Sequence, residues 1–277
     1  MKPNWLKIKL PENNNYQLVK NKLENAKIHT VCIEARCPNR IECWQKKSMT
    51  FMILGNICTR KCKFCAVETG NPMGKTDNTE VDKIAKIVKD LNLSYAIITS
   101  VTRDDLTDGG AEFFAQTIEA IRKTNHNVRI EVLVPDFSGQ ESSIVKVIDA
   151  GCGVFGHNLE TVKRLTPIVR DQRADYLCSL AVLKMARKIK PQLITKSGIM
   201  LGLGETEQEV KSTIKDLYDV GVNILTIGQY LQPAKGLLKV YDYIAPEQFE
   251  VYKNFALNLG LKKVIAGPLV RSSYIWQ

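Results

Sequence analysis

From residue 50 onward, short apolar runs rich in β-branched residues alternate with segments whose apolar residues recur at helical spacing. Strands and helices that alternate in this way form βαβ units and a parallel sheet. The pattern predicts strands at 51–57, 95–101, 128–134, 154–157, 193–201 and 223–227, and helices at 81–91, 111–123, 142–150, 174–189, 207–220 and 246–259. Six such units predict an α/β fold, a partial (βα)6 barrel of the TIM type, although an open doubly wound sheet has the same pattern.

The barrel pattern leaves a segment at each end of the chain. Residues 1–49 are predicted to be an N-terminal extension, with one short helix at 17–25 and breaks at 13–15 and 38–39. Residues 50–267 then form the barrel domain, and residues 268–277 form a short C-terminal tail. A chain of 277 residues is long enough for one large domain of this kind.

The net charge and the hydropathy of the chain indicate which kinds of partner molecule it can have. The net charge is +10, from 39 basic and 29 acidic residues, which favours an acidic partner, although lysines on a solvated surface give the same total. The lysines are scattered and have no interleaved aromatics, so we expect no nucleic-acid binding. The N-terminus has no apolar signal region, and no apolar run reaches 18 residues. We therefore expect a cytoplasmic protein without membrane contacts.

Six of the eight cysteines form two triplets: Cys32, Cys37 and Cys43 at C-x4-C-x5-C spacing, and Cys58, Cys62 and Cys65 at C-x3-C-x2-C spacing. A reducing cytoplasm favours metal ligation over disulfides. Three thiolates are one short of the four that close a zinc or ferredoxin site, so a cluster in each triplet would keep one iron open for another ligand. The two remaining cysteines, Cys152 and Cys178, are expected to be buried as small hydrophobes.

The segment Cys58-Thr-Arg-Lys-Cys62-Lys-Phe64-Cys65, placed after the first predicted strand, resembles the radical S-adenosylmethionine (radical SAM) superfamily. The resemblance implies that the three thiolates hold three irons of a 4Fe–4S cluster and that S-adenosylmethionine chelates the fourth. One electron from the cluster then cleaves the sulfonium and yields a radical that abstracts hydrogen. No acid–base residue is expected. Zinc is the alternative, but this spacing, without a fourth cysteine or a nearby histidine, suits tetrahedral zinc poorly.

The same resemblance suggests which residues contact the cosubstrate. Each also has an ordinary structural explanation, namely loop burial, a turn or a glycine-rich barrel corner. His157, in the same region, is expected to be a partly buried histidine rather than a proton carrier. The expected contacts are Phe64, the Gly109–Gly110 pair that opens a helix, Asn158 and Glu160 after the fourth strand, and Gly202 after the fifth.

The upstream triplet narrows the resemblance to the lipoyl synthase family. Segments 101–110, 131–136, 156–161 and 270–274 also resemble that family, so the resemblance covers nearly the whole chain. It implies that Cys32, Cys37 and Cys43 hold an auxiliary 4Fe–4S cluster whose fourth iron is bound by Ser273, with Ser272 as the alternative. A serine oxygen is an unusual ligand for such an iron, which suits a cluster that is consumed as a sulfur donor.

The resemblance implies a sulfurtransferase activity. Two sulfur atoms would be inserted at C6 and C8 of an octanoyl chain on a carrier lysine, with two S-adenosylmethionine molecules used per product. The implied partners are octanoylated carriers (glycine-cleavage H protein and dehydrogenase E2 lipoyl domains) and an electron donor such as a ferredoxin or flavodoxin.

Two other functions deserve comparison with this one. A radical methylthiotransferase acting on tRNA would need a further nucleic-acid-binding domain, and the sequence has no obvious segment for it. A non-enzymatic two-cluster electron carrier would need four ligands per cluster and no barrel.

Overall fold

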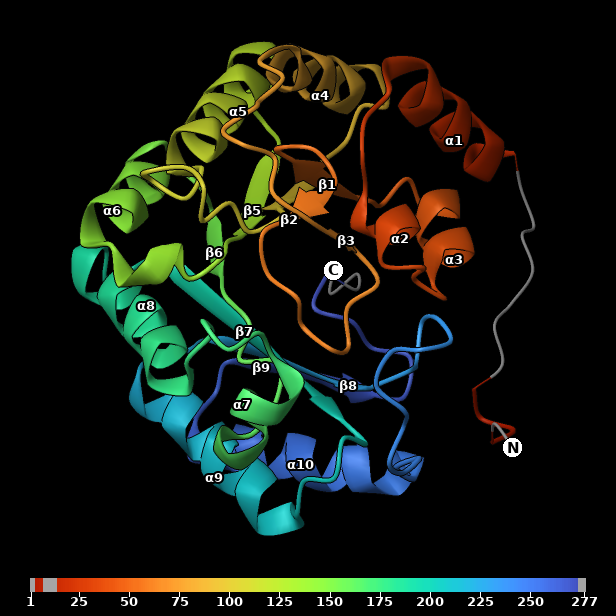
Figure 1. Cartoon of the computed structure of the whole chain (residues 1–277), viewed down its shortest axis with the longest axis vertical. Coiled ribbons are helices and arrows are strands. Elements are labelled where there is room, and N and C mark those ends of the chain that lie inside the picture. Colours follow the sequence, from red (N-terminus) through yellow and green to blue (C-terminus); the bar gives the residue numbers. More distant parts are fainter. Residues whose placement is uncertain (1–2, 7–13, 274–277) are drawn as a thin grey trace. The chain divides into compact units, whose positions relative to one another are not determined.

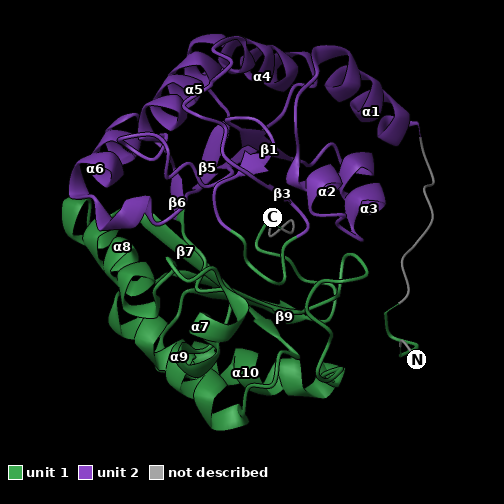
Figure 2. Cartoon of the chain, in the orientation of Figure 1, with its two compact units in different colours: residues 1–7, 61–65, 156–277 green, residues 8–60, 66–155 purple. Residues whose placement is uncertain are grey.

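The computed structural model describes residues 3–6 and 14–273 (Figure 1). Its internal contacts divide the chain into two units (Figure 2). Unit 1 comprises residues 1–7, 61–65 and 156–277, and unit 2 comprises residues 8–60 and 66–155. The chain therefore crosses from unit 2 to unit 1 and back within one short stretch, which is the stretch that carries the second cysteine triplet.

Unit 2 contains three parallel strands, β1 (Thr50–Ile53), β4 (Tyr95–Ser100) and β5 (Arg129–Leu133). Every residue of β1 is buried, as expected for a parallel strand with both faces covered. The helices α4 (Thr79–Asp90), α5 (Ala111–Thr124) and α6 (Glu141–Asp149) follow, and α5 packs against both of its neighbours (Figure 2). A short parallel pair, β2 (Ile57–Cys58) with β3 (Glu68–Thr69), lies in the same unit.

The N-terminal part of unit 2 is helical. It consists of α1 (Asn15–Ala26), α2 (Val31–Glu34) and α3 (Arg40–Gln45). Helix α1 packs against α3, with the rings of Tyr16 and Trp44 5.4 Å apart. Trp44 is 1% exposed, so this small helical region has its own apolar centre.

Unit 1 contains a second set of parallel strands, β7 (Ile194–Leu201), β8 (Ile224–Gln229) and β9 (Lys263–Gly267). Its helices are α7 (Thr166–Val169), α8 (Tyr176–Ile189), α9 (Glu207–Asp219) and α10 (Pro246–Leu259). Sequence signals define their ends. A capping box of Thr206 and Glu209 starts α9, whereas α10 begins with Pro246 and stops at the left-handed Gly260.

Strand β6 (Val154–Gly156) completes a parallel sheet of seven strands in the order β1-β4-β5-β6-β7-β8-β9. The α/β partial-barrel prediction is thus confirmed, with six strand–helix units and one additional strand. Among the described residues, no helix combines the length and apolar character needed to cross a membrane.

Several details differ from the sequence prediction, among them the short helices α2, α3 and α7, which were not expected. Strand β9 and the β2–β3 pair were not expected. The first strand ends at Ile53 rather than at residue 57, because Leu54 (φ 67°) and Gly55 (φ 78°) both adopt left-handed backbone conformations that turn the chain.

Candidate iron–sulfur and cosubstrate sites

The first triplet lies entirely in the helical part of unit 2. Cys32 belongs to α2, Cys43 belongs to α3, and Cys37 lies between the two helices. Backbone hydrogen bonds set the turns between them: Cys37 N donates to Cys32 O (3.2 Å) and Cys43 N donates to Asn39 O (2.9 Å). The three thiols are free, so all three sulfur atoms are available as ligands.

Two of the three thiols in this triplet have raised pKa values. Burial raises the pKa of Cys32 to about 11, and a charge on Cys37 adds to that rise, while the indole of Trp44 opposes it. Burial also raises the pKa of Cys43 to about 12, and charges on Cys32 and Cys37 add to it. Three thiolates gathered in a buried place repel one another unless a cationic group binds them, so this triplet fits a metal cluster.

The first triplet fits a cluster of several metal atoms rather than a single metal ion. Among the described residues, no three Cys, His, Asp or Glu side chains are arranged to hold one metal ion. In such a cluster each cysteine binds a different iron.

The predicted serine ligands lie in unit 1, after β9. Ser272 and Ser273 are both half-buried and follow Val270, which is buried. The tail passes close to β8: a side chain on Gly228 would place its Cβ 2.1 Å from Val270 O. Gly228 thus permits this close approach of the backbone. The assignment of Ser273 or Ser272 as a ligand stays a prediction.

Cys58, the first cysteine of the second triplet, ends β2 in unit 2 and is half-buried. Gly70 N donates to Cys58 O at 2.9 Å, which ties β2 to the end of β3. On the other side, Arg60 N donates to the Cys58 sulfur at 3.4 Å. Hydrogen bonds to sulfur are one of the means by which proteins adjust iron–sulfur clusters.

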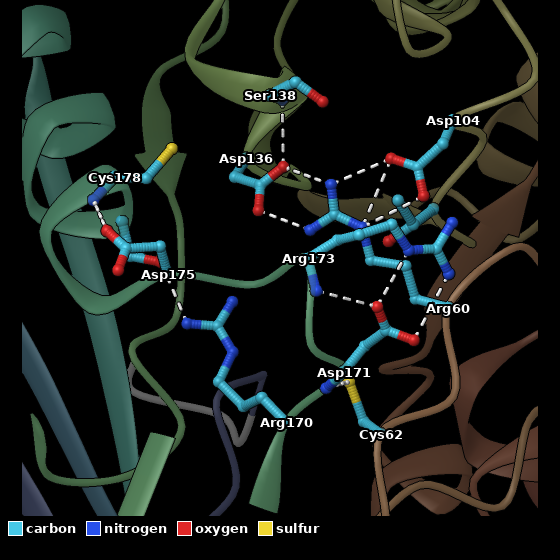
Figure 3. Close-up of polar contacts among 12 residues, drawn as sticks. Arg60, Cys62, Asp104, Asp136, Ser138, Arg170, Asp171, Arg173, Asp175 and Cys178 are labelled. Atoms are coloured by element: carbon cyan, nitrogen blue, oxygen red, sulfur yellow. Dashed lines mark hydrogen bonds and ion pairs between the residues drawn. The ribbon is translucent and has the colours of Figure 1, made fainter. Parts of the chain in front are cut away.

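The side chain of Arg60 is held between two carboxylates, as Figure 3 shows. Its Nε and NH2 donate to Asp104 at 2.8–3.2 Å, and its NH1 and NH2 donate to Asp136, the latter at 2.8 Å. Asp136 also accepts from Ser138 N at 2.9 Å, and Thr59 Oγ1 donates to Asp104 at 2.8 Å. Burial acts to lower the pKa of Arg60, but the hydrogen bonds to Asp104 and Asp136 outweigh it and raise that pKa. The segment carrying Cys58 is therefore fixed by a buried ion-pair network in unit 2.

The turn before Cys58 is held by two further charged residues of unit 2. Glu80, in the first turn of α4, accepts from Leu54 N (2.8 Å) and Gly55 N (3.2 Å), and burial raises its pKa. Arg103 is completely buried and donates to Leu54 O (3.3 Å) as well as to Asp105. The strained Leu54 is thus held through both its N–H and its carbonyl group.

Cys62 and Cys65 belong to unit 1 and are half-buried. Asp171, a few residues after α7, accepts from Lys61 N at 2.7 Å, and its own N–H donates to the Cys62 sulfur at 3.3 Å. Arg173 pairs with the Asp171 carboxylate and holds its pKa well below the usual range (Figure 3). Cys65 N donates to Cys62 O at 3.1 Å, which closes the turn between the last two cysteines.

Two of the predicted cosubstrate contacts are brought together beside β7 in unit 1. Asn158 donates to the Glu160 carboxylate at 3.0 Å, while Glu160 bridges to β7 through Gly198 O and Met200 N. Burial raises the pKa of Glu160, and the positive charge of Arg170 opposes that rise. A Cβ on Gly198 would lie 3.0 Å from Asn158 Oδ1, so this glycine leaves room for the asparagine. A pair of this kind offers both a donor and an acceptor to a polar ligand.

The other predicted contacts of unit 1 have structural partners of their own. Gly202 ends β7 with φ 89°, and a Cβ there would lie 2.2 Å from Gln229 Nε2. Glu205 accepts from Gly202 N at 2.5 Å and fixes this turn. Phe64 is half-buried and packs against the apolar core of the unit, which agrees with loop burial. Contact of Phe64 and Gly202 with a ligand stays a prediction.

In unit 2, Gly109 and Gly110 lie just before α5 with φ 62° and 91°. Both N–H groups donate hydrogen bonds within the loop: Gly109 N donates to Leu106 O (3.0 Å) and Gly110 N donates to the Asp108 carboxylate (2.8 Å). A Cβ on Gly110 would lie 2.2 Å from Leu54. The loop thus requires glycine for its own packing, and contact with a ligand stays a prediction.

The residues expected to have structural roles are mostly buried. His157 is 3% exposed and Cys152 is 3% exposed, as predicted. Cys178, on α8, was also expected to be buried but is only half-buried. Its backbone N–H donates a hydrogen bond to the side chain of Asp175, the residue that caps the helix, at 2.7 Å.

Sequence reasoning assigned no role to the charged residues that fix the second triplet. Asp104 follows β4 and Asp136 follows β5, at the carboxyl ends of strands where ligand-binding side chains gather in α/β folds, whereas Asp171 follows helix α7. Arg60 lies inside the cysteine motif itself. Their places in the sequence could have marked them as candidates. The pairing could not have been predicted, because Asp104 and Asp136 lie 44 and 76 residues away from Arg60 in the chain.

Comparisons with known proteins show to which family the chain is similar. Residues 52–217 match the family model of the radical SAM superfamily, and residues 1–37 match the N-terminal domain of lipoyl synthase of the radical SAM family. Lipoyl synthase of Caldicellulosiruptor saccharolyticus is 52% identical over 274 residues, covering 99% of this chain and 95% of that protein. Lipoyl synthase of Thermus thermophilus is 50% identical over 273 residues, covering 99% and 84%.

Solved structures of lower identity show the fold. Methylornithine synthase has a TM-score of 0.59 at 12% identity, covering 78% of this chain and 70% of that one. Coproporphyrinogen III oxidase from Escherichia coli, a radical SAM enzyme, has a TM-score of 0.58 at 17% identity, covering 76% and 52%.

These matches extend over nearly the full chain and include the region of both cysteine triplets. An enzyme of this kind is a sulfurtransferase that uses S-adenosylmethionine and two 4Fe–4S clusters. The chain belongs to the lipoyl synthase family of the radical SAM superfamily.

Proposed function

We propose that the chain inserts two sulfur atoms at C6 and C8 of an octanoyl chain carried on a lysine of a lipoyl-carrier protein. The observation that carries this proposal is the first triplet: three cysteines placed on α2, on α3 and between these helices, with Cys32 and Cys43 buried, in a chain of the lipoyl synthase family. A radical enzyme needs only the second triplet for cleavage of S-adenosylmethionine. A second set of cysteines is required when a cluster also supplies atoms.

The two ligand sets divide the work. Cys58, Cys62 and Cys65 would hold the cluster that donates electrons, with S-adenosylmethionine on its remaining iron. Cys32, Cys37 and Cys43, with Ser273 or alternatively Ser272, would hold the auxiliary cluster. When bound, the two groups supply an electron for sulfonium cleavage and the sulfur atoms for insertion, with two S-adenosylmethionine molecules used per product.

The residues of the chain then have binding and orienting tasks. Asn158 and Glu160 are the polar pair proposed to hold the ribose and methionine portions of S-adenosylmethionine, supported by their mutual hydrogen bond and by the buried Glu160 carboxylate. Phe64 and Gly202 would contact the adenine, and the Gly109–Gly110 loop would receive the methionine amino group. None of these tasks involves acid–base catalysis.

The remaining parts of the proposal concern organisation and partners. Residues 1–49 carry the auxiliary-cluster motif, residues 50–267 form the radical SAM barrel, and residues 268–277 contribute the serine ligand. The carriers are the glycine-cleavage H protein and dehydrogenase E2 lipoyl domains, with a ferredoxin or flavodoxin as the electron donor. The net charge of +10 favours acidic carriers. Two cysteine triplets that serve as metal ligands suit a cytoplasmic, reducing environment.

The proposal is tested by mass spectrometry of an octanoyl-lysine peptide after one turnover with reconstituted protein, S-adenosylmethionine and dithionite. We expect peptide with one and then two added sulfur atoms, together with 5′-deoxyadenosine. Peptide without sulfur despite abundant 5′-deoxyadenosine would contradict the proposal. A parallel incubation with tRNA, in which a methylthio group appeared on the RNA, would favour the methylthiotransferase instead.

A further inference from the structure

A segment from the middle of unit 1 runs alongside the stretch that carries Cys62. Lys63 N donates to Val169 O at 2.9 Å, and Lys61 N donates to the Asp171 carboxylate at 2.7 Å. Between these two contacts, Asp171 N donates to the Cys62 sulfur at 3.3 Å (Figure 3). Three hydrogen bonds thus join residues that are about 110 positions apart in the chain.

The direction of the Asp171 N–H is set by the surroundings of its side chain. Helix α7 ends at Val169, so this N–H lies beyond the regular helix. The Asp171 side chain is 8% exposed and is fixed by Arg173, whose Nε donates to Oδ1 at 2.9 Å and whose NH2 donates to Oδ2 at 3.2 Å. Arg173 N also donates to Oδ1 at 3.0 Å, and Ala174 N donates to Asp171 O at 2.9 Å. Both the side chain and the carbonyl of Asp171 are therefore held in place.

We propose that Asp171 is a positioning residue that presents its backbone N–H to the Cys62 sulfur and thereby raises the reduction potential of the cluster bound by Cys58, Cys62 and Cys65. One-electron reduction makes such a cluster more negative, and an N–H dipole directed at a ligating sulfur stabilises the more negative state. The inference builds on the ligand assignment of the proposed function, and adds a residue outside the cysteine motif that sets how readily the cluster accepts an electron.

The sign of the change in reduction potential distinguishes the hydrogen-bonding role of Asp171 from the effect of its negative charge. Removal of a carboxylate near a cluster removes a negative charge, which by itself makes reduction easier and raises the potential. Loss of the N–H···S hydrogen bond has the opposite sign. A lower potential in Asp171→Ala therefore indicates that the hydrogen bond dominates, whereas a higher potential indicates that only the charge matters.

The primary experiment is an electron paramagnetic resonance titration of reconstituted full-length protein. All variants carry Cys37→Ala, so that the cluster of the second triplet gives the signal. In Asp171→Ala we expect the equilibrium constant for one-electron reduction to fall about threefold, which corresponds to about 28 mV at 59 mV per tenfold change. Asp171→Asn, which keeps an oxygen acceptor for Lys61 N, should show a smaller fall.

Asp175→Ala is the matched control. It removes an aspartate four residues away whose side chain caps α8 through Cys178 N, and it leaves the contacts of residues 61–63 intact. Its potential should equal that of the parent protein. Equal potentials in Asp171→Ala and the parent, a higher potential in Asp171→Ala, or equal falls in both variants would each overturn the proposal.

A second measurement uses the iron-free protein and covers the case in which Asp171→Ala binds little cluster. Hydrogen exchange in peptides spanning 59–66 should become about tenfold faster in Asp171→Ala, because the N–H group of Lys61 loses its carboxylate acceptor, and should not change in Asp175→Ala. Unchanged exchange in Asp171→Ala would contradict the positioning role. Neither measurement depends on sulfur insertion. The comparison of Asp171→Ala with Asp175→Ala therefore still tests the positioning role if the mass-spectrometry assay finds no sulfur in the peptide.

Discussion

The two cysteine triplets are held by different kinds of interaction. Cys32 and Cys43 lie in short helices beside the buried Trp44, and burial dominates the environment of their thiols. Cys58, at the end of β2, and Cys62, in the loop that follows, are half-buried, and charged side chains fix the backbone around them. The first site is thus shaped by apolar packing and the second by ion pairs.

The largest expected effect separates the two sites by removing one ligand from each. Cys58→Ala should abolish 5′-deoxyadenosine formation, since the electron-donating cluster is lost. Cys37→Ala should leave S-adenosylmethionine cleavage largely intact and stop sulfur transfer. High-performance liquid chromatography of 5′-deoxyadenosine and mass spectrometry of the peptide measure the two outcomes. Loss of cleavage in both variants, or in neither, would contradict this division of labour.

Packing at the first triplet is broken by Trp44→Ala. Because Trp44 is 1% exposed, its removal should cost about 3–5 kcal/mol of folding free energy. Iron bound by the first triplet should be lost, while 5′-deoxyadenosine formation persists at temperatures where the protein stays folded. Urea denaturation and iron analysis check both results. Trp5→Ala is the control, because Trp5 is 45% exposed and its removal should change neither quantity.

The charge support of the second triplet is broken by Arg60→Ala. This variant leaves Asp136, which is 2% exposed, as a buried carboxylate without its cation, at a cost of about 3–5 kcal/mol. Arg60→Lys should recover only part of the loss, because one ammonium group cannot make the paired contacts to both carboxylates.

The readouts for the Arg60 variants are thermal unfolding and the kcat and KM of S-adenosylmethionine cleavage. The control is Arg164→Ala, which removes an exposed partner of Glu209 and should have almost no effect. If Arg60→Ala and Arg164→Ala behave alike, the buried network does not support Cys58.

A smaller effect should follow from Gly228→Ala, which concerns the tail that carries Ser272 and Ser273. The new Cβ would lie 2.1 Å from Val270 O, so the tail must shift, at a cost of about 1–3 kcal/mol. We expect slower sulfur transfer with unchanged 5′-deoxyadenosine formation. Gly153→Ala is a suitable control, because its nearest contact would be an ordinary 3.4 Å. Equal sulfur transfer in both variants would show that the position of the tail is unimportant.

The smallest effect is a pH dependence at Glu80. Burial raises its pKa in the folded chain above the usual 4.5, so its contribution to stability is greatest below that value and is lost as the pH rises through the raised pKa. Relative to Glu80→Gln, the unmodified iron-free protein should therefore lose stability as the pH rises above 4.5. Urea midpoints across this range measure the difference. A parallel pH dependence in both proteins would exclude Glu80 as its source.

Most of the fold could be predicted because parallel strands and amphipathic helices have local signals. The predicted helix at 246–259 coincides with α10, and that at 111–123 stops one residue short of the end of α5. Strand β9 was missed because it begins at a lysine and ends at a glycine, with only a short apolar run between them. The β2–β3 pair is only two residues long in each strand, which is too short for a periodic signal.

The cysteines of the candidate sites could be predicted from spacing alone, whereas their supports could not. The ion pair between Arg60 and Asp136 spans 76 residues, and no local pattern encodes such a contact. The same holds for Asp171 and Lys61. Only a three-dimensional arrangement shows that these charges serve the cysteines. Contacts of the cosubstrate residues and of Ser273 remain predictions, because they involve groups that the chain must bind.

The 110-residue separation between Lys61 and Asp171 has a consequence for synthesis on the ribosome. At about 5–20 residues per second, the cysteines of residues 61–65 emerge about 5–20 s before their supporting segment exists. During that interval, the stretch with Cys62 and Cys65 lacks its hydrogen bonds to Asp171 and the segment around it. Loading of the second triplet with iron is therefore expected to follow, rather than accompany, translation of the C-terminal half. Until that segment is made, the thiols of Cys62 and Cys65 are open to oxidation.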